Sequence, residues 1–155
     1  MKNQLTKFTQ GFTLAELMAV IVIIGILAGI GLGSYRKGID RARFSDGLTG
    51  AHAIAAAVDE YYYENREAPA NVSKLAVSLK GGSISGNTVN TPNFTYTYNS
   101  SNKYVTAASK NATPAYTIVV YTDMAGGVHP DQCNGAVEFC QSMGYKTCTG
   151  TSCVK

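Results

Sequence analysis

Charged residues are scarce in this chain. Asp, Glu, Lys and Arg make up 15% of its 155 residues, and the formal net charge is only +3. A charge this small and this scattered argues against nucleic acid as the main partner, although it leaves that question open. The two histidines, His52 and His129, stand far apart, and no nucleophile and base are spaced around them convincingly. We therefore expect no catalytic site, no cofactor and no resident metal, and thus not an enzyme.

Cysteine is missing from most of the chain. All four cysteines fall in the last 23 residues, at Cys133, Cys140, Cys148 and Cys153. The gaps of six, seven and four residues between them lack the paired C-x-x-C spacing of zinc sites. An even count in a tail that contains Gly and Ser favours two disulfides, which need an oxidising compartment. Three pairings are possible and the sequence does not choose among them; reduced thiols and metal ligation are the alternatives.

No charge at all occurs from Leu17 to Tyr35. These 19 residues would form about 28 Å of helix, close to the ~30 Å hydrocarbon thickness of a bilayer. A secretory signal peptide would have a shorter apolar core and a small-x-small cleavage site. A plain single-pass anchor accounts for the length of the run. It does not account for Glu16 at the leading edge, where an ionised carboxylate is costly.

The charges that flank the apolar run conflict with the cysteines over orientation. Basic residues are more numerous after the run than before it: Lys2 and Lys7 precede it, and Arg36, Lys37, Arg41 and Arg43 follow it. Counting these charges would leave the C-terminal part in the cytoplasm. Disulfides would require that part to lie in an oxidising compartment. We follow the cysteines, together with the leader motif described next, and expect the C-terminal part outside the cytoplasm.

The stretch Gly11-Phe12-Thr13-Leu14-Ala15-Glu16, between a short basic leader and the apolar helix, resembles the class III leader of type IV pilins and type II secretion pseudopilins. The resemblance implies that a membrane-embedded prepilin peptidase cuts between Gly11 and Phe12. The same enzyme would N-methylate the new amine of Phe12. Glycine suits the cut because it has no side chain to keep a protease from the backbone.

The same resemblance gives Glu16 a role in assembly, in which it pairs with the Phe12 amine of a neighbouring subunit. Opposite charges attract strongly in a low-dielectric setting, and each is costly while unpaired. Docking into a filament would therefore relieve a penalty that both groups carry, and it would fix the axial offset between subunits. The alternative is a Glu16 side chain that extends to the cytoplasmic interface without a partner.

A helical pattern continues beyond the apolar run. Its apolar positions recur at alternating spacings of four and three: Phe44, Leu48, Ala51, Ala55, Val58 and Tyr62. The helix should end near Asn65, before Pro69, and residues 70–93 indicate a loop. Three strands are predicted after the loop, at 94–98, 103–107 and 116–122. The cysteine tail should lie along the edge of their sheet, too polar to form much core.

These patterns and the resemblance together imply an α+β type IV pilin fold, in which a long N-terminal helix packs on an antiparallel sheet and disulfides close the C-terminal region. We expect a cleaved leader at residues 1–11 and a transmembrane or filament-core helix at 12–35. An amphipathic helix should follow at 36–65, and a globular head at 66–155.

The resemblance further implies a structural subunit, a pilin. It would sit in the inner membrane as a single-pass protein and then polymerise into a helical homo-oligomeric filament. Its partners would be the prepilin peptidase and an inner-membrane assembly platform with a cytoplasmic ATPase. The product would be an extracellular type IV pilus, serving adhesion, twitching motility or DNA uptake.

Two alternatives to a pilin remain. One is a type II secretion pseudopilin in a periplasmic pseudopilus, and the other is a membrane-anchored periplasmic binding module that never polymerises. A disulfide-closed C-terminal region favours the pilin. Bound calcium would favour the pseudopilin, but Asp123 and Asp131, near a Gly-rich loop, are thin support for an ion that takes six or more oxygens.

Overall fold

The structure, a computed structural model, describes residues 11–126 and 129–155, and for residues 31–33 it describes the backbone alone. The chain divides into two compact units, Met1–Ile39 and Asp40–Lys155. Each unit is considered by itself. Apart from Gly11, the expected leader with Lys2 and Lys7 lies outside the described residues.

The first described element is helix α1, Leu14–Asn65. It ends where the sequence predicts. The amide of Asn65 donates a hydrogen bond back to the Tyr61 carbonyl, 2.9 Å away. Arg66 then takes a left-handed conformation at φ 57° while its N–H bonds the Tyr62 carbonyl at 2.8 Å. A residue with positive φ breaks the helical geometry, and Pro69 follows where no helical N–H can be supplied.

The length and composition of α1 bear on the expected membrane segment. In the part of the chain that the structure describes, no helix by itself has the length and apolar composition that crossing a bilayer requires. The segments Leu14–Ile30 and Ser34–Asn65 have them only when taken together. The N-terminal helix is thus a candidate membrane anchor.

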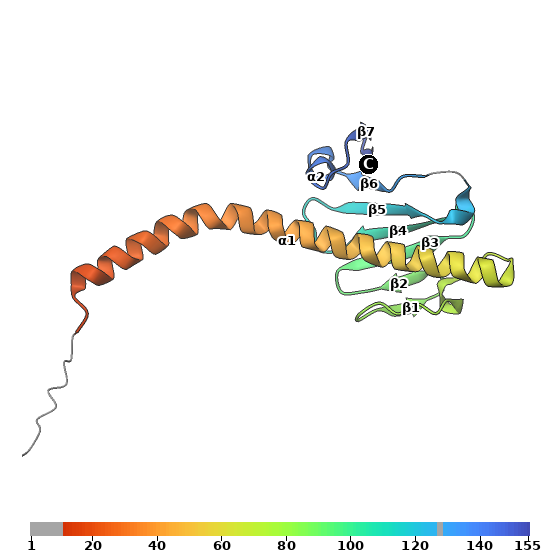
Figure 1. The fold of residues 1–155 in the computed structure, drawn as a ribbon, viewed down its shortest axis with the longest axis horizontal. Helices are drawn as coiled ribbons and strands as arrows, with labels where there is room; N and C mark the ends of the chain where they lie inside the picture. The colour runs from red at the N-terminus through yellow and green to blue at the C-terminus, as the bar shows by residue number, and fades with distance from the viewer. Residues whose placement is uncertain (1–10, 127–128) are drawn as a thin grey trace, which may run out of the picture. The chain divides into compact units, whose positions relative to one another are not determined.

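An eight-stranded antiparallel sheet dominates the second unit, in the order β1-β2-β3-β4-β5-β6-β8-β7 (Figure 1). Its centre is made by the three predicted strands, now bounded as β3 Phe94–Asn99, β4 Tyr104–Ser109 and β5 Tyr116–Tyr121. The outer strands are β1 Ser83–Ser85, β2 Thr88–Asn90, β6 Gln132–Gly135, β7 Thr147–Thr149 and β8 Ser152–Val154. Between β6 and β7 the chain forms a short helix, α2 Val137–Ser142, and two 3-10 turns lie at Val72–Lys74 and Asp123–Ala125.

The C-terminal part of α1 covers one face of the sheet and builds the core with it (Figure 1). Four of the six predicted stripe residues are buried, and Leu48 and Tyr62 are half-buried. Ile54, which the stripe omitted, is fully buried as well. Opposite them, alternate residues of the central strands point inward, as the register Tyr98↔Val105↔Val120 illustrates. The expected α+β arrangement of a long helix on an antiparallel sheet is confirmed.

Two expectations for the head are wrong. Residues 70–93 are not all loop, because β1 and β2 extend the sheet and Val89 is buried opposite Tyr96. The cysteine tail also contributes to the core: Cys133, Cys140, Tyr145 and Cys153 are fully buried. A half-cystine in a disulfide has no polar hydrogen left to satisfy, so it packs as an apolar side chain. The short strands come from pairing with their neighbours, which a local polar composition does not reveal.

Candidate processing and assembly site

The predicted cleavage bond lies just before α1. Gly11, Phe12 and Thr13 are not helical, and the helix begins at Leu14. Phe12 is 84% exposed, and among the described residues, chain neighbours apart, no group lies within 4 Å of the position that a Gly11 side chain would take. A peptidase must bind its substrate in an open, accessible form. The Gly11–Phe12 bond meets that requirement within its own unit.

Thr13 and Glu16 form a reciprocal cap on the first turn of α1. The Thr13 N–H and hydroxyl both donate to Glu16 Oε2, at 2.9 and 2.7 Å. In return, the Glu16 N–H donates to Thr13 Oγ1 at 3.2 Å. This is the capping-box arrangement, in which a threonine at the N-cap and a glutamate three residues later satisfy free N–H groups at the helix start. Sequence analysis left Thr13 without a role, although the T-x-x-E spacing carries that signal.

The cap lowers the energetic cost of the charge on the Glu16 carboxylate. Its negative charge lies at the positive end of the helix dipole and accepts two hydrogen bonds within its own chain. A solitary chain therefore already offsets part of the cost of this charge. The expected partner, the Phe12 amine of another copy, would add to or replace these bonds. That pairing remains a prediction.

The helix surface that follows the cap is apolar and exposed on all sides. Large apolar side chains between Phe12 and Ile30 are 44–84% exposed, with Val20 the least exposed and Phe12 the most. A helix that is hydrophobic all round is stable only when lipid or other protein covers it. Within its own unit, this segment has no such cover.

The predicted cysteines lie in the second unit and form two disulfides, Cys133–Cys140 and Cys148–Cys153. This pairing is one of the three that the sequence left open. The first bridge joins β6 to α2, and the second joins β7 to β8 across their antiparallel pair. The expected disulfide-closed C-terminal region is therefore confirmed.

The two candidate calcium ligands have other contacts. Asp131 accepts a bond from His52 Nε2 on α1 at 3.0 Å. The backbone N–H of Asp123 donates to Asp59 Oδ2 on α1 at 3.1 Å. Burial raises the pKa of the Asp59 carboxyl, and backbone N–H groups of the Asp123 turn oppose that rise. Among residues 11–126 and 129–155, no group of three or more His, Cys, Asp or Glu side chains could hold a metal.

Comparison with known proteins bears on the N-terminal segment most directly. Residues 7–32 match the family described as "Prokaryotic N-terminal methylation motif". The chain is 42% identical over 69 residues to a fimbrial protein of Neisseria meningitidis, across 44% of this chain and 41% of the relative. It is 38% identical over 97 residues to a type IV major pilin of Neisseria gonorrhoeae, across 60% of this chain and 58% of the relative.

These similarities support a type IV pilin family member. A fimbrial protein of Moraxella nonliquefaciens is 49% identical over 49 residues, across 32% of each chain. The match spans about half the length of the curated relatives, and no solved structure was found to match. The long helix on an antiparallel sheet, with two disulfides near the C-terminus, fits the type IV pilin fold.

Proposed function

We propose that the chain is the structural subunit of a type IV pilus, cut between Gly11 and Phe12 and polymerised through its N-terminal helix. The observation that carries this proposal is the apolar surface from Phe12 to Ile30, exposed all round behind a single capped carboxylate. Such a surface needs one environment before assembly and another after it. Lipid supplies the first, and the helices of neighbouring subunits supply the second.

The cleavage step gives Glu16 its partner. Cutting after Gly11 creates a cationic amine on Phe12, one residue before the cap. In a filament this amine would lie beside Glu16 of an adjoining copy, in surroundings where water cannot screen either charge. The Thr13 cap holds the carboxylate at the helix end, where that contact would form. Assembly thus exchanges a bond within one chain for an ion pair between two.

The proposed processing and assembly also imply where the subunit is located and which partners it has. Before assembly the subunit would be a single-pass protein of the inner membrane, with its disulfide-closed head outside the cytoplasm. The prepilin peptidase and an assembly platform would be its partners, and the product would be an extracellular pilus for adhesion, twitching motility or DNA uptake. The role is structural, not enzymatic, in keeping with relatives named fimbrial proteins and pilins. The head disulfides favour this proposal over a pseudopilin.

The first test is the mature N-terminus. Mass spectrometry of the protein from a host with its peptidase should find a chain that begins with N-methylated Phe12. The variant Gly11→Val should keep the leader, because a branched side chain obstructs the backbone at the cut. A wild-type chain that still begins at Met1 in such a host would remove the basis of the proposal.

The second test addresses Glu16. Glu16→Ala should enter the membrane normally but fail to form filaments, whereas Glu60→Ala, an exposed acid farther along the same helix, should assemble as wild type. In purified wild-type fibres, a Glu16 carboxylate should lie within about 4 Å of the Phe12 nitrogen of an adjoining copy. Normal filaments from Glu16→Ala would favour a binding module or a different assembly contact.

A further inference from the structure

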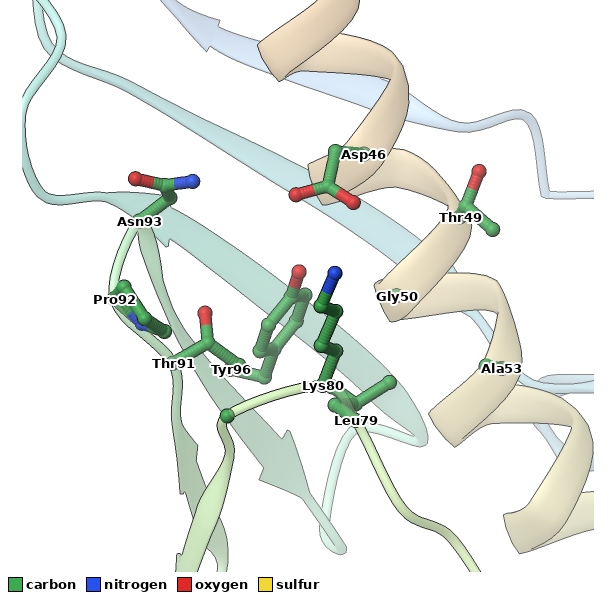
Figure 2. Close-up of a pocket in the computed structure, with 11 residues that line it drawn as sticks. Asp46, Thr49, Gly50, Ala53, Leu79, Lys80, Thr91, Pro92, Asn93 and Tyr96 are labelled. Atoms are coloured by element: carbon green, nitrogen blue, oxygen red, sulfur yellow. The ribbon is translucent and has the colours of Figure 1, made fainter.

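A cavity of about 580 Å³ opens in the second unit between α1 and the loops at one edge of the sheet. One wall is the α1 surface around Asp46 and Gly50, and the other is formed by Lys80, before β1, and by the turn from β2 to β3 at Asn93. Tyr96 of β3 reaches it from the sheet (Figure 2). The proposed assembly chemistry uses none of these residues.

Glycine on α1 lets the sheet approach the helix beside this cavity. A Cβ at Gly47 would lie 2.5 Å from the Phe94 ring, and one at Gly50 would overlap the Tyr96 hydroxyl. Tyr96 therefore occupies space that any other residue at position 50 would fill. Its side chain is only 3% exposed, yet its hydroxyl reaches the cavity wall.

The polar groups around the cavity are available to a ligand. Figure 2 shows the ends of Lys80 and Tyr96 pointing toward the part of α1 that carries Asp46, with Asn93 on the other side. Asp46 and Lys80 form no salt bridge with each other or with other described residues, among which His52–Asp131 is the pair observed. Burial, followed by the Asp46 charge, raises the pKa of Tyr96 to about 12, so its hydroxyl remains a proton donor at neutral pH.

These groups define the class of ligand. The wall has one acid and one base, so its formal charge is zero, and an anion would meet Asp46 just as a cation would meet Lys80. Carboxylate and amide groups can each bond two adjacent hydroxyls, and Lys80 and Tyr96 add donors. Apolar parts of Ala53, Leu79 and Pro92 offer surface for C–H groups. Known pockets for small ligands occupy roughly 300–1,000 Å³, a range that includes this cavity.

We propose that this cavity is a binding site for a neutral saccharide, one or two sugar rings at the end of a glycan. Asp46 and Asn93 bond its hydroxyls, Lys80 donates from the loop wall, and the Tyr96 hydroxyl donates from the floor. The site belongs to the single head and does not depend on filament assembly.

The test uses the full mature chain, ¹⁵N-labelled, in micelles of a polyoxyethylene detergent, which has no sugar headgroup to compete. Lactose, N-acetyllactosamine and maltose are titrated separately while backbone amide signals are followed by NMR. At least one disaccharide should shift the amides of Gly50, Lys80 and Asn93 in a saturable way. Glycine betaine and inorganic phosphate, the zwitterionic and anionic probes, should not.

Two variants decide whether the cavity groups cause the shifts. Asp46→Ala should weaken binding at least about tenfold, and Tyr96→Phe about three- to tenfold, as expected for losing a charged and a neutral hydrogen-bond partner. Asp40→Ala, an acid on the same helix outside the cavity, should bind as wild type. Equal affinity in all three variants would overturn the proposal. So would shifts caused by betaine or phosphate, or no saturable shift with any of the three disaccharides.

Discussion

Phe44 should be among the most costly residues to truncate in the head. Its side chain is 5% exposed and lies between three other aromatic rings: Tyr116, Phe139 and Tyr145, with ring centroids 5.4, 6.1 and 5.7 Å away. These rings come from β5, from α2 and from the loop before β7. Phe44 is thus the point at which α1 holds the sheet and the disulfide-closed region together.

The loss in free energy of unfolding can be estimated from the burial of Phe44 and from its neighbours. Replacing a buried Phe with Ala costs about 3–5 kcal/mol, through lost transfer free energy and the cavity left behind. The rigid rings and two nearby disulfides limit how far the site can collapse, which favours the upper half of that range. Since small domains are stable by about 5–15 kcal/mol, Phe44→Ala should remove a large part of the total. Phe44→Leu should cost less because it leaves a smaller void.

The assay is urea unfolding of the mature chain in micelles, followed by near-ultraviolet circular dichroism of the buried tyrosines. This signal reports the head, whereas far-ultraviolet dichroism would also include the helix inside the micelle. Tyr63→Ala is the control: Tyr63 is 58% exposed, so its free energy of unfolding should change by no more than about 0.5 kcal/mol. A loss below about 1 kcal/mol for Phe44→Ala would refute the argument.

The same variant tests whether processing of the first unit depends on the stability of the second. Thr13 and Glu16 bond each other within the first unit, whereas the ring contacts of Phe44 lie within the second. Under the processing proposed above, prepilin peptidase should therefore cut Phe44→Ala in membranes as completely as wild type. Loss of processing at a temperature where the head is still folded would show that the cleavage site depends on the head after all.

Three further predictions concern the cap, a buried acid and a disulfide. Thr13→Ala should cost the first turn of α1 about 0.5–2 kcal/mol, seen as faster amide exchange at residues 14–17, and Thr13→Ser should restore it. The pKa of Asp59 is raised above 3.8 by burial, so the folded chain binds this proton more tightly than the unfolded chain. The stability of wild type relative to Asp59→Asn should accordingly fall as pH rises through the range just above 3.8 and then level off; a relative rise in melting temperature over that range would contradict the assignment. Replacing the Cys133–Cys140 pair, seven residues apart, with serine should cost about 2–3 kcal/mol or more in urea unfolding, and a neutral result would mean that packing alone holds α2.

Local sequence patterns predicted the elements that are long enough for their apolar residues to show a helical or alternating repeat. The stripe from Phe44 to Tyr62 repeats over several turns, so its period distinguishes a helix from other structures. The FTYTY pattern of β3 alternates without a break and predicts the bounds of the strand to within one residue. Strands β1 and β2 have three residues each, too few to show an alternating pattern, and the Ser, Thr and Asn residues at four of these six positions are typical of a loop.

The sequence alone determined the long helix, its end at Asn65, the central strands and the G-F-T-L-A-E motif, because each is marked by a pattern of residues within one short stretch of the chain. Only the tertiary structure decided which cysteines pair, that Tyr145 enters the core, and that Gly50 leaves room for Tyr96 beside a cavity. Those outcomes depend on which distant segments share a surface. A polar tail or a lone glycine carries no local signal of the neighbour that folding will bring to it.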